Sequence, residues 1–213
     1  MCWSFEVSLL SGLFSYTVGF YLWLRNYQND RWHAILLFVF TAIQFWEAGL
    51  WWCKNNNKMN APYVLLAVTF LIPLTLALEP VASLYGAHYL GKNIDTYDIM
   101  IYIGVFIYLF YTLIKDNPYP NVIRNDGIEY SKPSTDDSQF PLIIFLCLVV
   151  YPLLKYSDFN KFYILMTVIL FTTLCLAMLR QHAIASQWCL YSNIFAAIAL
   201  FYPYIASSSP IAA

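Results

Sequence analysis

The sequence predicts an all-α integral membrane protein, a single bundle of about seven transmembrane helices. Of its 213 residues, 61% are hydrophobic and only 11% are charged, whereas soluble domains carry about 25% charged residues. The mean hydropathy of +0.58 is correspondingly high. Aromatic residues make up 19% of the chain, as expected if tryptophan and tyrosine form belts at the two membrane interfaces. A chain this poor in charge is expected in a membrane rather than in water.

Seven apolar segments, most of them separated by short polar connections, are candidates for the helices, since a membrane-spanning helix needs about 20 mostly apolar residues. They cover residues 7–24, 33–53, 62–90, 97–114, 140–155, 162–180 and 187–205. The third segment contains Pro73 and Pro80. Because a proline ring clashes with the carbonyl four residues earlier, we expect one long helix with a kink near Glu79. The alternative is a short helix followed by a re-entrant or interfacial piece.

We expect residues 1–206 to form one transmembrane domain and residues 207–213 to form a flexible tail. One connection is long, over residues 116–139, and contains Asp126-Gly127 between "VIRN" and "IEY". Because Asp-Gly is a hairpin-turn signal, this connection either carries a small two-stranded flap or is disordered. The sequence shows no internal repeat, so it gives no support to an inverted-repeat transporter.

Two acids lie inside apolar segments. Within the stretch "TAIQFWEAGLWW" (residues 41–52), Gln44, Glu47 and Trp51 are spaced i, i+3 and i+7 and share one helix face. An ionised carboxylate in hydrocarbon costs at least about 2.5 kcal/mol, so Glu47 is expected to face other helices, with a partner or in its neutral form. Gln44 is one candidate partner. Glu79 is either a second station in an ion or proton path or a residue at a helix break.

The first segment carries a stripe of serines at steps of four, three and four residues. Its members are Ser4, Ser8, Ser11 and Ser15. One interpretation is a polar lining opposite Glu47; the other is a packing seam, because small residues at this spacing let helices approach closely. The last segment has a mildly polar stripe of its own, which includes Asn193.

The cysteines and histidines do not predict a metal site or another cofactor. None of the five cysteines forms a CxxC pair, and Cys2 is expected either to form a disulfide on an oxidising side of the membrane or to remain a free thiol. His33 and His88 fall on one side of the predicted bundle and His182 on the other, about 30 Å away. A covalent retinal pigment is also not expected, because residues 187–205 contain no lysine to form a Schiff base.

Two motifs resemble a family of uncharacterised polytopic membrane proteins. They are the Met-Cys-x-Ser opening (residues 1–4) and a Gln-x-x-Glu-x-x-x-Trp element in the second helix (residues 44–51). The third segment, with Pro73 and Glu79, is also similar, so the resemblance covers roughly the first 80 residues. The family provides no activity to carry over. The resemblance implies one site formed by Cys2, Ser4, Gln44, Glu47 and Trp51.

The leading functional hypothesis is a channel or transporter for an ion, a proton or a small polar solute. Glu47 would be the gating or binding acid, lined by Gln44 and the serine stripe, and Glu79 would be a second acid along the path, because intramembrane acids mark such paths. A purely structural role for Glu47, tying helices together, is the simpler alternative. Asn193 and Trp51 would complete the polar pocket.

Two other classes of function stay open. An intramembrane enzyme acting through Cys2 or Glu47 is less expected, because the sequence shows no complete nucleophile–base pair and the catalytic residues are unknown. A receptor-like protein could hold an apolar ligand in its aromatic-rich interior. The net charge of −1 offers no basic face for nucleic acid. The expected partners are membrane lipids, a small ion or solute and, in a homo-oligomer, further copies of the chain; the sequence does not show which membrane holds it.

Overall fold

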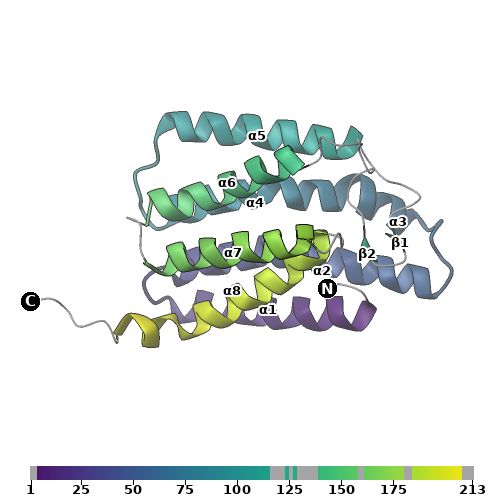
Figure 1. Ribbon diagram of the computed structural model, residues 1–213, viewed down its shortest axis with the longest axis horizontal. Coiled ribbons are helices and arrows are strands. Elements are labelled where there is room, and N and C mark those ends of the chain that lie inside the picture. The colour runs from purple at the N-terminus through teal and green to yellow at the C-terminus, as the bar shows by residue number, and fades with distance from the viewer. Residues whose placement is uncertain are drawn as a thin grey trace, which may run out of the picture.

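The computed structural model describes residues 4–115, 123–124, 127–128, 139–157, 161–179 and 184–207, with side chains over 4–115, 144–157, 161–172 and 190–202. Over these residues the chain forms seven helices packed in a bundle (Figure 1), which confirms the predicted all-α fold class. Their bounds are α1 (Phe5–Arg25), α2 (Asp30–Asn55), the helix made of α3 (Pro62–Leu66), η1 (Ala67–Leu71) and α4 (Ile72–Tyr89), α5 (Thr96–Lys115), α6 (Gln139–Lys155), α7 (Lys161–Leu179) and α8 (Ile184–Ser207).

Helices α1 and α2 form a close antiparallel hairpin. A Cβ atom at Gly12 would lie 3.1 Å from the Phe45 ring, and one at Gly19 would lie 3.0 Å from the Phe38 ring. The two glycines therefore let α1 approach α2 closely, as small residues do between membrane helices. The pairing also sets the register, since residues early in α1 face residues late in α2.

The third helix has an irregular turn nearer its start than the sequence predicts. It runs without a break from Pro62 to Tyr89, but residues Ala67–Leu71 form a π-helical turn in which the Ile72 N–H donates to the Ala67 carbonyl, five residues back. Such a wide turn makes room for the ring of Pro73 just after it, and π-turns are a known cause of helix irregularity. The predicted single long helix is confirmed, and it contains a π-turn about two helical turns before Glu79.

The long connection contains a short antiparallel pair of strands, β1 (Ile123–Arg124) and β2 (Gly127–Ile128). Arg124 pairs with Gly127, so the glycine of the predicted turn lies in a strand. The rest of this connection lies outside the described residues. Of the predicted tail the structure describes only Ser207, which is the last residue of α8.

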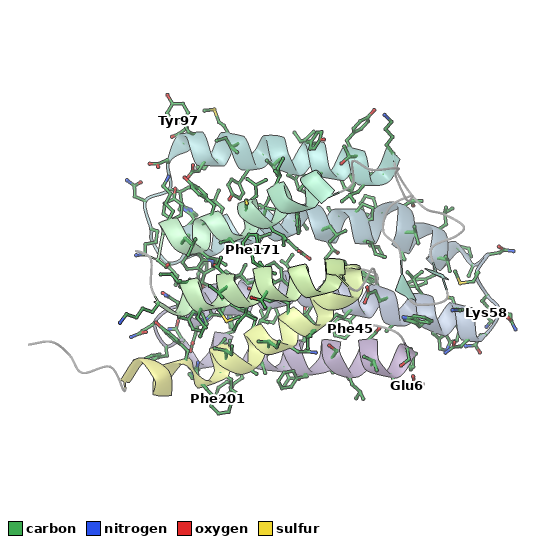
Figure 2. All side chains as sticks on the ribbon, in the orientation of Figure 1. Glu6, Phe45, Lys58, Tyr97, Phe171 and Phe201 are labelled. Carbon is green, nitrogen blue, oxygen red and sulfur yellow. The ribbon has the colours of Figure 1, made fainter. Side chains whose placement is uncertain are left out.

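The outer surface of the bundle is apolar. Four helices are long and apolar enough to cross a membrane, namely α1, α2, the Pro62–Tyr89 helix and α5. Helix α5 lies at one edge of the bundle and α1 at the opposite edge (Figure 1). Large hydrophobic side chains such as Tyr97 and Phe201 point away from the bundle (Figure 2). Soluble monomers rarely expose apolar patches of more than a few hundred Å², so this surface suits hydrocarbon.

Trp32 anchors the packing of α2 against α4. Its indole N–H donates to the Ser83 carbonyl at 2.9 Å, and the side chain is fully buried. A Cβ atom at Gly86 would lie 2.1 Å from the Trp32 ring, so only glycine fits there. Further along the same pair, the Trp46 indole donates to the Thr75 hydroxyl at 3.0 Å. These contacts fix which residues of α4 lie level with which residues of α2.

Candidate functional site

Three helices, α1, α2 and α8, meet along a line of polar side chains. We call this line the polar seam and define it by Ser8, Ser11, Ser15, Thr41, Gln44, Glu47, Ser192 and Asn193. Among the hydrogen bonds described in the seam, Asn193 of α8 makes two. Its amide nitrogen donates to the Ser11 hydroxyl, and its amide oxygen accepts from the Ser15 hydroxyl at 2.7 Å. The predicted serine stripe thus meets the predicted polar position of the last helix.

Gln44 reaches α8 from the other side of the seam. Its amide nitrogen donates to the hydroxyl of Ser192, the neighbour of Asn193. Consecutive residues of a helix point about 100° apart, because the helix has 3.6 residues per turn. Helix α8 therefore presents Ser192 to α2 and Asn193 to α1, and one short stretch ties three helices together.

The bond between Gln44 and Ser192 differs from the expected pairing of Gln44 with Glu47. The side chain of Gln44 is fully buried, and within the described residues its amide oxygen accepts no hydrogen bond. Glu47 lies one turn further along α2 and is only 1% exposed, on the same face as Trp51. The predicted shared face is therefore a buried face of α2.

Two further hydroxyl groups in the seam are buried without a hydrogen-bond partner among the described residues, those of Ser8 and Thr41. Because Gly12 lies against Phe45, Ser8 stands one turn nearer the start of α1, close to the level of Glu47. Thr41 precedes Gln44 by three residues on α2. Buried polar groups without partners are costly and uncommon, so each one calls for an explanation.

Glu79 of α4 is fully buried and lies between two contacts that tie α4 to its neighbours. One turn before it, Thr75 accepts from Trp46; one turn after it, the Ser83 hydroxyl donates to the Val149 carbonyl of α6 at 2.7 Å. These contacts place Glu79 opposite the middle of α2, close to the level of Thr41. Glu47 lies about 10 Å further along the α2 axis.

The remaining predicted site residues lie apart from the seam or outside the described residues. Ser4 is the N-cap of α1, where its hydroxyl accepts the Val7 N–H at 3.2 Å. The Lys54 ammonium lies over the Trp51 ring, 4.6 Å from the ring centroid. Cys2 is not described. Sequence reasoning missed Thr41 and Ser192, although Thr41 stands about one turn before Gln44 on α2 and Ser192 is the neighbour of Asn193.

The opposite end of the bundle carries its own polar groups, held in ion pairs. Arg25 of α1 binds Asp30 of α2 through two nitrogens, at 2.6 and 2.8 Å, and donates to the Leu200 carbonyl of α8 at 2.8 Å. His33, fully buried, lies 2.8 Å from the Tyr163 hydroxyl. No group of three or more His, Cys, Asp or Glu side chains that could hold a metal ion is found among the described residues.

A second ion-pair network at this end joins α5 to α6. Lys155 binds Asp95 at 2.6 Å and Asp98 at 2.9 Å. Tyr156, which follows α6, donates to the Asp98 carboxylate. Burial raises the pKa of the Tyr156 phenol, and the hydrogen bond to Asp98 acts in the same direction.

The chain matches no protein-family model, no curated protein and no solved structure. The family resemblance of residues 1–4 and 44–51 therefore stays a prediction. A function for this chain is therefore argued from the positions of its buried polar groups.

Proposed function

We propose that the protein is a multi-pass membrane protein that moves protons through its helix bundle, with Glu47 and Glu79 as the two protonatable stations. The observation that carries the proposal is the burial of both carboxyl groups, 1% and 0% exposed, within helices that are long and apolar enough to cross a membrane. Acidic side chains are costly in such surroundings, and where they persist they commonly belong to ion or proton paths.

Two polar side chains of α2 at the levels of the two acids support a relay. Thr41 and Gln44 stand on α2 between the level of Glu79 and the level of Glu47, and each has a buried oxygen that accepts no hydrogen bond among the described residues. Ser8 provides a third such oxygen near Glu47. Buried oxygens without partners are the groups that bound water molecules satisfy, and a file of such waters passes protons without the wide aqueous passage that a hydrated ion would need.

The seam also contributes to stability, and this role belongs to its neutral side chains, Gln44 included, rather than to the two acids. The bonds from Asn193 to Ser11 and Ser15, and from Gln44 to Ser192, join neutral groups of three helices. Interhelical hydrogen bonds of this kind hold membrane helices together. Substitutions of the acids and of the tie residues should therefore separate transport from stability.

The test is proton flux into vesicles. The purified full-length chain is reconstituted into phosphatidylcholine vesicles that contain a pH-sensitive dye, and an imposed pH gradient drives the flux while potassium and valinomycin hold the membrane potential at zero. We expect flux in the parent protein and its loss in Glu47→Gln. Glu6→Gln is the matched control, because Glu6 is an exposed acid in the first turn of α1.

The proposal fails if the parent protein carries no protons, or if Glu47→Gln conducts as well as Glu6→Gln at equal protein content. Loss of flux together with an unfolded Glu47→Gln variant would be ascribed to folding. Circular dichroism and thermal melting of each reconstituted variant therefore accompany the flux measurement. The variant Glu47→Asp, which keeps the carboxyl group, should retain part of the flux.

A further inference from the structure

A groove of about 380 Å³ runs along the outer surface of the bundle between α4 and α5. Helix α4 contributes Leu78, Val81 and Tyr85 to its walls, and α5 contributes Ile103 and Phe106. Small-molecule sites are typically of this size and mostly apolar, with a few polar groups that orient the ligand. Here His88, in the last turn of α4, stands at one end.

The groove has the length of one leaflet of a bilayer and runs from the middle of the helices to their end. Leu78 and His88 are separated by about 15 Å along the axis of α4, which is half of a hydrocarbon core of about 30 Å. Leu78 lies near the middle of the Pro62–Tyr89 helix, and Phe106 lies near the middle of α5. The His88 end therefore coincides with the boundary of the apolar region, where the polar connection to α5 begins.

The Lys155 ammonium near this end is already paired with two carboxylates. Lys155 is held between Asp95 and Asp98, at 2.6 and 2.9 Å, so its positive charge is already balanced by two carboxylates. Lys155 therefore offers little surplus charge to a lipid phosphate, and Arg31 and Lys92 are further cations at this end of the bundle. The His88 imidazole can donate or accept one hydrogen bond, which suits a hydroxyl group.

We propose that this groove binds a sterol, with the fused rings against Val81, Tyr85 and Ile103 and the hydroxyl group at His88. A rigid, flat molecule loses little conformational freedom on binding, which favours it over a flexible acyl chain in the same groove. The segment Leu84-x-x-x-x-Tyr89-x-x-Lys92 also has the Leu–Tyr–Lys spacing proposed for sterol contact. That pattern is weak by itself, but Leu84 lines this groove.

The experiment uses the full-length protein in phosphatidylcholine vesicles with a photoactivatable cholesterol analogue. We expect ultraviolet light to attach the probe to the peptides that contain Val81 and Ile103, as mapped by mass spectrometry, and excess cholesterol to prevent it. Ile103→Trp, which fills the groove, should abolish the labelling. Ile101→Trp is the matched control, since Ile101 and Ile103 are 53% and 56% exposed on the same helix and only Ile103 lines the groove.

The hydroxyl contact is tested separately with His88→Phe. Removing one hydrogen bond should weaken competition by cholesterol about two- to tenfold. The 3α-epimer, which misplaces the hydroxyl group, should compete poorly against the parent protein and as well as cholesterol against His88→Phe. Equal competition by the two epimers in the parent protein would overturn the assigned orientation.

The sterol assignment is overturned if Ile103→Trp is labelled like Ile101→Trp, or if a photoactivatable phosphatidylcholine labels the groove and cholesterol does not displace it. The second outcome would mean ordinary contact with bulk lipid. Should Ile103→Trp fail to fold, Val81→Phe narrows the groove from α4 and serves the same purpose. Binding is measured without any flux, so its outcome is independent of the proton path.

Discussion

The two polar regions of this bundle are stabilised in different ways. At the end that holds Arg25 and Asp30, charged groups form ion pairs that join one helix to the next. In the polar seam the hydrogen bonds between described residues join neutral side chains, such as Asn193 with Ser15. An ionised group costs less near a membrane boundary than further inside it, so the buried carboxyl groups of Glu47 and Glu79 are the acids that call for an explanation.

This contrast leads to an ordered set of expectations. The buried ion pair should be the most sensitive to loss of one partner, the neutral ties of the seam should be intermediate, and the exposed ion pair should be the least sensitive. Transport should follow a different order, because it depends on the two buried acids.

The largest loss of stability is expected for Asp30→Asn. Asp30 is fully buried, and its removal leaves the Arg25 guanidinium without its carboxylate partner. Breaking a buried pair in this way costs about 3–5 kcal/mol. Reversible unfolding in mixed detergent micelles measures the change, and a free energy of unfolding within about 1 kcal/mol of the parent protein would contradict the structural role.

An intermediate loss is expected for Asn193→Leu. The substitution removes both hydrogen bonds to the serine stripe and puts an apolar side chain of similar size in place of the amide. Interhelical hydrogen bonds of membrane proteins are worth about 0.6 kcal/mol on average and at most about 1.7, so two bonds predict a loss of about 1–3 kcal/mol. In the double-mutant cycle with Ser15→Ala the two losses should not add; simple additivity would show that the groups do not interact.

The smallest loss is expected for Asp95→Asn. Asp95 is largely exposed, with 58% of its side chain accessible, and its pair with Lys155 is open to solvent. Exposed pairs contribute about 0–1 kcal/mol. Added salt should reduce even this difference, because salt screens exposed charges. A loss as large as that of Asp30→Asn would remove the distinction between the two ion pairs.

The sequence predicts the helices well because length and hydropathy determine them locally. The contacts between helices are harder to predict from the sequence. Ser15 and Asn193 each lie on a visible polar stripe, but 178 positions separate them and no local pattern says which helices adjoin. Ser4 was assigned to the stripe by its spacing, whereas its place just before an apolar helix is the usual signal for an N-cap.

The position of the π-turn is a second feature that the sequence does not predict. Pro73 and Pro80 both disturb a helix in the same way, so the sequence alone offers two places for a kink. In the structure Pro80 is accommodated inside α4 without interruption, whereas the turn before Pro73 widens to a π-helix. The two prolines are equivalent in the sequence, so this difference is visible only in the structure.

The central claim is that Glu47 and Glu79 act in series on one proton path, and the most direct test compares proton flux in Glu79→Gln, Glu47→Gln and the double variant. If the acids act in series, each single substitution should reduce flux to the level of the double variant, while Glu6→Gln conducts like the parent protein. Flux at the parent rate in Glu79→Gln, with Glu47→Gln silent, would contradict the shared path.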